Sequence, residues 1–134
     1  MAGPMEQRII VVAKESSLRT QLMHHLRQEG FSVFTTEREE KVDTMLSGPG
    51  RRLVLLGLDG LKREGIAILR MIRSRYPQVA VITINAGHQL DLSIEAMRLG
   101  AFDDFLIPFD LDGLMERIHQ ALKQTSTGPR KERS

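Results

Sequence analysis

The sequence predicts an α/β fold, a three-layer doubly wound five-stranded parallel sheet with helices on both faces. Short solid apolar runs alternate with longer segments of helical spacing, which is typical of alternating strands and helices. Gly, Pro or capping residues lie between most of these segments. The chain has 134 residues, enough for one domain with a proper core and too few for two. Five such strand–helix pairs favour right-handed parallel crossovers.

The first pair begins with a strand over Arg8–Ala13. This segment is apolar on both faces, as a central strand between two helical layers requires. Ser16 or Ser17 can cap the helix that follows, and Gly30 marks its end. Its apolar residues repeat every fourth position, at Leu18, Leu22 and Leu26.

The second pair consists of a strand over Phe31–Thr36 and a helix over Glu37–Leu46. The apolar face of this helix carries Val42, Met45 and Leu46. After a turn at Gly48–Gly50, the third strand is predicted over Leu53–Leu58. A loop and then a helix over Glu64–Arg75 follow. That helix ends before Pro77 and buries Ile68, Leu69 and Ile72.

The fourth strand is predicted over Val79–Ile84, and a helix over Gln89–Leu99 ends at Gly100. A short fifth strand covers Asp103–Ile107. After Pro108 comes the last helix, which Asp110 caps and whose inner stripe holds Leu111, Leu114, Ile118 and Leu122.

Composition excludes several classes of protein. The sequence has no Cys, which excludes disulfide scaffolds, thiol nucleophiles and zinc sites built on thiolates. Apolar runs are too short for a membrane span, and Met1–Gln7 lacks the apolar stretch of a signal peptide. We therefore expect a cytoplasmic protein without membrane contact.

The ends of the chain differ from its centre. We expect residues 1–5 to be a disordered end or residues left from cloning, 6–124 to form the domain, and 125–134 to be a polar basic tail or a linker toward a missing output domain. The net charge is +2, from 19 Lys and Arg against 17 Asp and Glu. Segment 123–134 contributes four of those basic residues and one acidic residue. Nucleic-acid binding through the tail is thus a minor alternative, because the rest of the chain is slightly acidic.

In doubly wound folds, ligands bind beyond the carboxyl ends of the strands. Five segments form a pattern. Three include or follow such strand ends: Ile9–Glu15, Leu53–Gly57 and Pro108–Asp110. The other two, Glu64–Gly65 and Glu95–Ala101, lie at the start and at the end of predicted helices. In this pattern the chain resembles the receiver domain of bacterial two-component response regulators over nearly its whole ordered length. The segment Ala96–Phe102 is most similar to receivers attached to sigma-54-type transcription activators. The resemblance implies the flavodoxin-like receiver fold, (βα)5.

The resemblance also implies a phosphorylation switch. In this family an acidic pair after the first strand and an Asp ending the third hold magnesium, and that Asp accepts phosphate from a histidine kinase. A Thr or Ser after the fourth strand and a Lys before the Pro after the fifth contact the phosphoryl group. Aligned without gaps, the acidic pair falls on Ala13 and Lys14, the acceptor on Gly57, the hydroxyl residue on Asn85 and the Lys on Ile107.

None of the five positions matches, although Glu15 beside the pair and Pro108 after the last strand are retained. Magnesium prefers oxygen ligands, and Ala13 and Lys14 supply none from their side chains. Gly57 has no carboxylate to form an acyl phosphate. We therefore expect a degenerate receiver, a pseudo-receiver, with no metal, no cofactor and no enzymatic activity.

Three points stay open at this stage. Asp59 offers an alternative acceptor, against the reading of a solvated loop acid. The Lys14 ammonium either occupies the metal position, paired with Glu15 or Asp59, or extends into water. The register of the fifth strand decides whether Asp104 or Phe105 holds the family's aromatic switch position.

We expect the domain to act by binding a protein partner or a second copy of itself. In the family, the helix before the fifth strand, that strand and the last helix form the interaction face. Carried over to this sequence, the candidate contacts are Arg98, Phe102, Asp104, Phe105 and Ile107.

Overall fold

The computed structural model describes residues 7–85, 87, 90–106 and 110–126, the last three without their side chains. Five strands form one parallel sheet in the order β2-β1-β3-β4-β5. This order is that of the flavodoxin-like doubly wound fold, so the predicted fold class is confirmed. The expected end at 1–5 and residues 127–134 of the tail expected over 125–134 lie outside the described residues, whereas the last helix runs on to Ser126, two residues beyond the expected domain end at 124.

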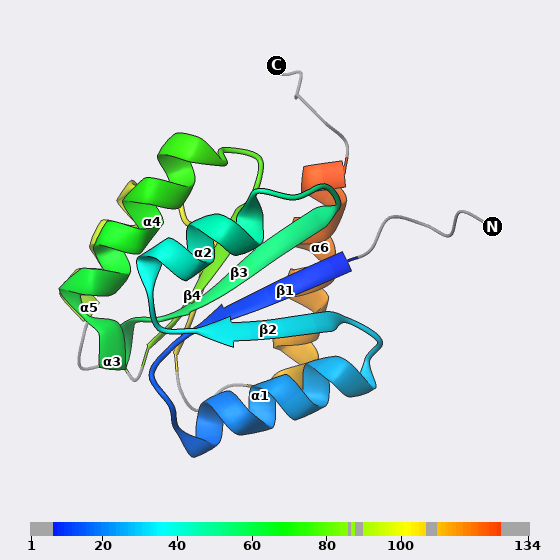
Figure 1. The fold of residues 1–134 in the computed structure, drawn as a ribbon. Coiled ribbons are helices and arrows are strands. Elements are labelled where there is room, and N and C mark those ends of the chain that lie inside the picture. Colours follow the sequence, from blue (N-terminus) through cyan, green and yellow to red (C-terminus); the bar gives the residue numbers. More distant parts are fainter. Residues whose placement is uncertain (1–6, 86, 88–89, 107–109, 127–134) are drawn as a thin grey trace.

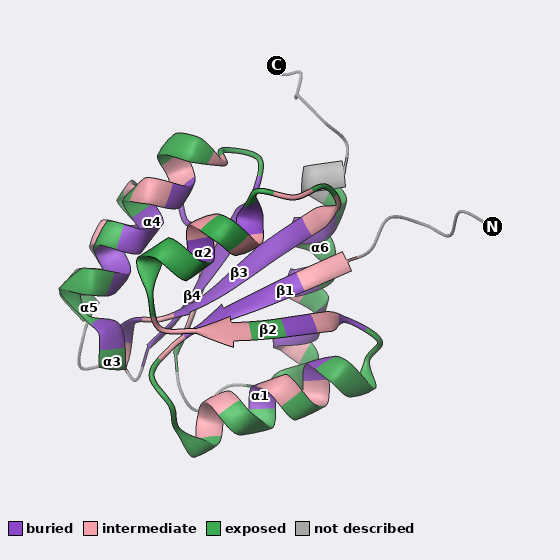
Figure 2. Ribbon diagram, in the orientation of Figure 1, coloured by how far each residue is buried: buried purple, intermediate pink, exposed green. Residues whose placement is uncertain are grey.

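The strands are β1 (Gln7–Val12), β2 (Ser32–Thr36), β3 (Arg51–Gly57), β4 (Ala80–Asn85) and β5 (Asp103–Leu106). The three central strands are almost fully buried, because helices cover both of their faces (Figure 2). Their side chains alternate between two cores. In β1, Ile10 and Val12 face one core, and Ile9 and Val11 face the other.

Two helices, α1 (Ser17–Gln28) and α6 (Leu111–Ser126), cover one face of the sheet (Figure 1). The opposite face carries the other four, α2 (Glu39–Leu46), α3 (Leu58–Leu61), α4 (Arg63–Arg75) and α5 (Leu90–Arg98). The helix starts follow the predicted caps. Ser16 accepts a hydrogen bond from the Arg19 backbone N–H at 3.1 Å, and Asp110 accepts one from Gly113 at 3.3 Å.

Chain reversals after α1 and α5 need glycine. Gly30 and Gly100 have φ of +94° and +106°, a region that L side chains rarely adopt. At Gly100 an added Cβ would also lie 2.9 Å from the Arg73 Nε. Both glycines therefore end their helices where the sequence predicts.

The structure corrects two predictions. β3 ends at Gly57, and Leu58 begins the short helix α3 where a strand end and a loop were expected. Leu58 and Leu61 are buried in the core on the α4 side of the sheet, and a helical turn brings both of these leucines to that core. Leu111, predicted for the inner stripe of α6, is the first residue of that helix and is 38% exposed, whereas Leu114, Ile118 and Leu122 are buried.

Candidate functional site

The carboxyl ends of β1 and β3, here called the β1–β3 side, lie where the resemblance places metal and acceptor. Gly57 ends β3 with φ −86° and ψ 109°, an ordinary extended conformation. A Cβ added there would lie 3.0 Å from the Ala13 Cβ, a separation tighter than ordinary van der Waals contact. The Ala13 methyl thus closes the space in which a side chain at position 57 would begin.

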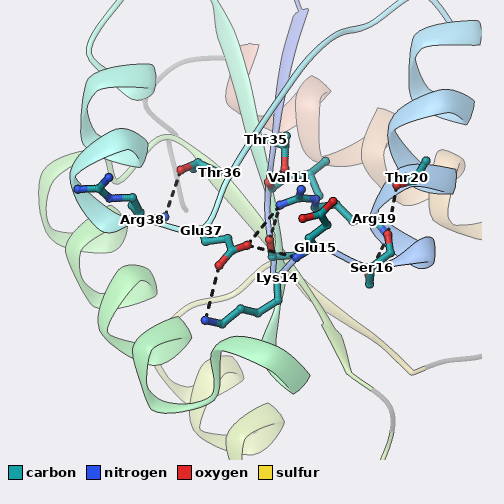
Figure 3. Close-up of polar contacts among 11 residues, drawn as sticks. Val11, Lys14, Glu15, Ser16, Arg19, Thr20, Thr35, Thr36, Glu37 and Arg38 are labelled. Carbon is teal, nitrogen blue, oxygen red and sulfur yellow. Dashed lines mark hydrogen bonds and ion pairs between the residues drawn. The ribbon is translucent and has the colours of Figure 1, made fainter.

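Lys14 does not fill the metal position as an internal cation. Its side chain is 51% exposed, and its ammonium lies 3.6 Å from a carboxylate oxygen of Glu37, beyond the end of β2 (Figure 3). The aliphatic stem passes over Gly60, where an added Cβ would lie 2.5 Å from the Lys14 Cγ. Of the two readings left open, the one with the ammonium in water is the one observed, with Glu37 as partner instead of Glu15 or Asp59.

Glu37 also organises the loop after β1. Its carboxylate accepts a hydrogen bond from the Glu15 backbone N–H at 3.3 Å, and Arg19 Nη1 lies 3.9 Å from the same oxygen. Arg19 in turn donates to the Ala13 carbonyl at 2.9 Å (Figure 3). The backbone of 13–15 is therefore held by protein groups, and the retained Glu15 is exposed.

Asp59 lies in the first turn of α3, directly after Gly57 and the fully buried Leu58. Asp59 is half-buried and takes part in a polar or electrostatic interaction within the domain. The backbone is strained at Lys62, which joins α3 to α4 and has φ 53° and ψ −126°. A non-glycine residue adopts this conformation only where the surroundings impose it.

The ends of β4 and β5 with the adjoining part of α5, here called the β4–β5 side, carry a connected polar network. Asn85, fully buried, donates from Nδ2 to the Ser93 hydroxyl of α5, and its Oδ1 accepts from the Gly87 N–H at 3.3 Å. Ser93 donates to Asp104 Oδ1 at 3.1 Å, and Thr83 donates to the same oxygen at 2.6 Å. One carboxylate oxygen thus ties β4, β5 and α5 together.

In the register of β5, Thr83 pairs with Asp104, and Ile84 pairs with Phe105. Asp104 points toward α5, and Phe105 packs on the opposite face with α1 and α6. In the alignment without gaps, Asp104 is the residue at the aromatic switch position of the family. Ile107 and Pro108 lie outside the described residues.

A second contact fixes α5 to α4. Arg63 donates two hydrogen bonds to Glu95, at 2.6 and 3.2 Å, and Arg70 donates a third at 3.3 Å. The hydrogen bonds from Arg63 lower the pKa of Glu95 below its ordinary value and raise the pKa of Arg63. Both groups are charged at neutral pH, so the pair is present under ordinary conditions.

Ile107 lies outside the described residues, and of the other four expected interaction contacts only Arg98 is well exposed. Phe102 and Phe105 pack against the α1–α6 core, with the Arg117 guanidinium 4.6 Å from the Phe102 ring centroid, and Asp104 belongs to the buried network. Sequence reasoning missed four apolar residues that are exposed on α5 and β5: Leu90, Ile94, Met97 and Leu106. The apolar spacing of 90, 94 and 97, beside the inward residues of the same helix, was the available signal.

The donor set does not fit magnesium. In place of the acidic pair and the acceptor carboxylate, the β1–β3 side presents a methyl group, an outward ammonium and a glycine. Within the described residues, no group of three or more His, Cys, Asp or Glu side chains could hold a metal ion. None of the helices in the described part of the chain combines the length and apolar character that a membrane span needs.

Comparison with known proteins agrees with the geometry. The family model described as "Response regulator receiver domain" matches residues 9–119. Two relatives are the DNA-binding transcriptional regulator NtrC of Salmonella typhimurium, 30% identical over 112 residues, and an NtrX-like response regulator of Rickettsia felis, 29% identical over 119 residues. These matches cover 84% and 87% of this chain but 24% and 25% of the relatives, so the chain spans about a quarter of their length.

Three solved structures of NtrX from Brucella abortus superimpose on this chain with TM-scores between 0.76 and 0.78. The isolated domain gives 0.76 at 28% identity, over 86% of this chain and 98% of that one. The similarity therefore extends over the full receiver domain, in sequence and in fold.

Proposed function

The chain belongs to the receiver domain family of two-component response regulators, and we propose that it works there without phosphoryl transfer, as a protein-interaction module. The observation that carries this proposal is at Gly57. No acceptor carboxylate is present, and the Ala13 methyl lies 3.0 Å from where any Cβ at 57 would be. An acyl phosphate needs a carboxylate nucleophile, and this position has none.

The remaining pocket chemistry supports the same proposal. Ala13 and Lys14 supply no carboxylate for a divalent ion, and the Lys14 ammonium is paired with Glu37. Asn85, at the position of the phosphoryl-contacting hydroxyl residue, is already hydrogen-bonded to Ser93 and Gly87. A phosphoryl group would therefore meet neither metal nor unengaged hydroxyl at these positions.

The proposal places function on the surface of the domain, at the face of α5 and β5 next to α6. Four apolar side chains between 44% and 53% exposed lie there, beside the exposed Arg98; they are Leu90, Ile94, Met97 and Leu106. A cluster of this kind on a small domain marks a site of protein contact. Hydrogen bonds to α4 and β5 hold α5 in place, so the apolar cluster is presented in one arrangement.

Incubation with acetyl phosphate and magnesium, followed by intact mass spectrometry, tests the proposal. The expected result is an unchanged mass, under conditions in which a receiver with a complete acidic pocket gains one phosphate. A gain of one phosphate by this chain would contradict it. If Asp59→Asn then removed that gain, Asp59 would be the acceptor.

A restoration variant separates the acceptor from the metal site. Gly57→Asp supplies the missing carboxylate, and we expect it to remain unphosphorylated because Ala13 and Lys14 leave magnesium unheld. Gly57→Asn is the matched control, with the same size and no nucleophile. Magnesium-dependent labelling of Gly57→Asp alone would show that the pocket still binds the ion.

A further inference from the structure

The edge of the sheet at which the strands begin, here called the amino edge, collects positive charge. All five strands are parallel, so the helices between them run back, and α1, α2, α4, α5 and α6 end at this edge (Figure 1). Except in α2, the last turns of these helices contain Arg or Lys: Arg27, Arg73, Arg75, Arg98 and Lys123. Strand starts add three arginines, Arg8 in β1 and Arg51 and Arg52 in β3.

Acidic residues gather at the opposite edge of the sheet. The first turns of five helices contain Asp or Glu: Glu39, Glu40, Asp59, Glu64, Asp91 and Asp112. Of the acidic residues described near the amino edge, Asp43 is paired with Arg75 and Asp103 with Arg117, which leaves Glu29. The small net charge of the chain, +2, therefore conceals two edges of opposite sign.

Helix dipoles do not cancel the positive charge of the amino edge. The C-terminus of a helix carries about half a unit of negative charge, and at the end of α2 this half unit faces two arginines. Arg8 donates to the Met45 carbonyl at 3.3 Å. Arg52, which is 8% exposed, donates to the carbonyls of Leu46 and Gly48. Burial and the neighbouring charge of Arg8 lower the pKa of Arg52, so two cations are held close together there.

Other arginines of the amino edge are held by groups that do not neutralise them. Arg27 donates to the Val33 carbonyl at 3.1 Å, and Arg73 donates to the Val79 carbonyl at 3.3 Å. Because a carbonyl has no net charge, each guanidinium keeps its full charge and has further N–H groups that can donate. Arg51 points to the α1–α6 side of β3, whereas the next residue points to the other side. The positive charge therefore extends over both helical layers.

We propose that the amino edge binds the phosphate backbone of a nucleic acid. This inference goes beyond the proposed function, which concerns a protein partner at α5 and β5. Apart from Lys123, the cations of this edge are arginines, and a guanidinium group can donate two parallel hydrogen bonds to one phosphate. Phosphates repeat at short intervals along a nucleic acid, so they can meet cations spread along an edge. Backbone contacts carry no sequence information, and we expect little preference for base sequence.

The character of the edge favours a nucleic acid over an acidic protein. Protein interfaces have an apolar centre that contains most of the binding energy. Of the large exposed apolar residues in the described chain, Leu90, Leu106 and Leu111 lie at the opposite edge, and only Met97 lies in the last turn of a helix. Contacts at the amino edge are therefore mainly ionic, as in binding to a nucleic-acid backbone.

Fluorescence anisotropy of the full chain with a labelled DNA duplex of mixed sequence tests the proposal. We expect affinity to fall at least tenfold between 50 and 200 mM salt, which corresponds to counterion release at about two or more phosphates. Arg51→Glu and Lys123→Glu should each weaken binding and reduce the slope of log affinity against log salt by about one. Arg38→Glu is the matched control, because Arg38 is exposed at the opposite edge, before α2, and undergoes the same change of charge. Circular dichroism verifies that each variant is folded.

A variant of the tail separates the amino edge from the end of the chain. With Arg130→Ala, Lys131→Ala and Arg133→Ala combined, we expect salt-dependent binding to persist. Binding that this variant abolishes and Arg51→Glu leaves intact would assign the contact to the tail and overturn the proposal.

Other results would overturn the proposal as well. They are a lack of binding at 50 mM salt, and equal losses from Arg38→Glu and Arg51→Glu. Polyglutamate that competes as well as unlabelled duplex would show that the edge takes an acidic protein segment instead. Phosphorylation plays no part in these outcomes, and Arg51 and Lys123 lie outside α5 and β5, so the proposed function stands or falls separately.

Discussion

The two sides of the carboxyl-terminal edge of the sheet carry different kinds of groups at the positions where the resemblance places the family's functional residues. On the β1–β3 side the functional groups are reduced to a methyl group, a glycine and a lysine that points outward to Glu37. On the β4–β5 side they are replaced by a hydrogen-bond network through Asn85 and Asp104. Small groups close the β1–β3 side, whereas hydrogen-bonded polar groups fix the β4–β5 side.

This difference shows what each region contributes. Phosphoryl transfer in this family needs an acceptor carboxylate and a bound metal ion together, and the β1–β3 side offers neither group at the aligned positions. A partner that binds at α5 depends on the position of this helix. Under the proposed function, a hydrogen-bond network that holds α5 in one arrangement keeps the surface of the helix available without phosphorylation.

Asp104→Ala should destabilise the domain by about 1–2 kcal/mol, because it removes the acceptor of the buried Ser93 hydroxyl and leaves the buried Thr83 hydroxyl with the longer contact to the Asp103 carbonyl at 3.4 Å. Urea unfolding followed by circular dichroism measures the loss. Asp104→Asn retains an acceptor oxygen and should cost clearly less. Equal stability of Asp104→Ala and the unaltered chain would show that the network does not hold α5.

Gly57→Ala should cost about 1–2 kcal/mol, because the new methyl group would lie 3.0 Å from the Ala13 Cβ. Combining it with Ala13→Gly removes the opposing methyl group, so the double variant should lose less than the two single losses added together. Thermal unfolding of the three variants completes the cycle. Simple additivity would mean that the two positions do not restrict one another.

Lys62→Gly should stabilise the domain by about 1 kcal/mol, since Lys62 has φ 53° and glycine adopts this conformation without steric cost. The gain is limited by the greater freedom of glycine in the unfolded chain. Lys62→Ala, which keeps the Cβ, is the control and should bring no gain. A lower melting temperature for Lys62→Gly would show that the lysine side chain contributes more than its backbone strain costs.

The smallest effect concerns pH. Hydrogen bonds from Arg63 lower the folded-state pKa of Glu95, so its contribution is present above the usual glutamate value of 4.5 and is lost as pH falls through the lowered value. The stability difference between the unaltered chain and Glu95→Gln should therefore be largest near neutral pH and shrink below about pH 4. Urea unfolding at several pH values measures it. A pH-independent difference would contradict this.

Much of the fold follows from sequence because local pattern and burial agree. Solid apolar runs such as Leu53–Leu56 form central strands, and Ser16 and Asp110 cap the helices they precede. The four-residue α3 was missed, since Leu58 reads equally as the end of a strand and its helical turn comes from packing against α4.

The site was predictable only where it depends on residue identity. The missing carboxylates at positions 13, 14 and 57 are visible in the sequence. The direction of Lys14 is not, because its partner Glu37 lies 23 positions later and is brought near by the pairing of β1 with β2. Likewise, the role of Asp104 depends on Ser93 and Thr83, which only the β4–β5 register places beside it.

Under the proposed function, the β1–β3 side holds neither magnesium nor a phosphoryl group. Two-dimensional NMR of the isotope-labelled chain, titrated with magnesium and beryllofluoride, tests it directly because every backbone amide reports on its surroundings. We expect no saturable shift at residues 13–15, 57–59 or 85. Saturable, magnesium-dependent shifts confined to these positions would contradict the account.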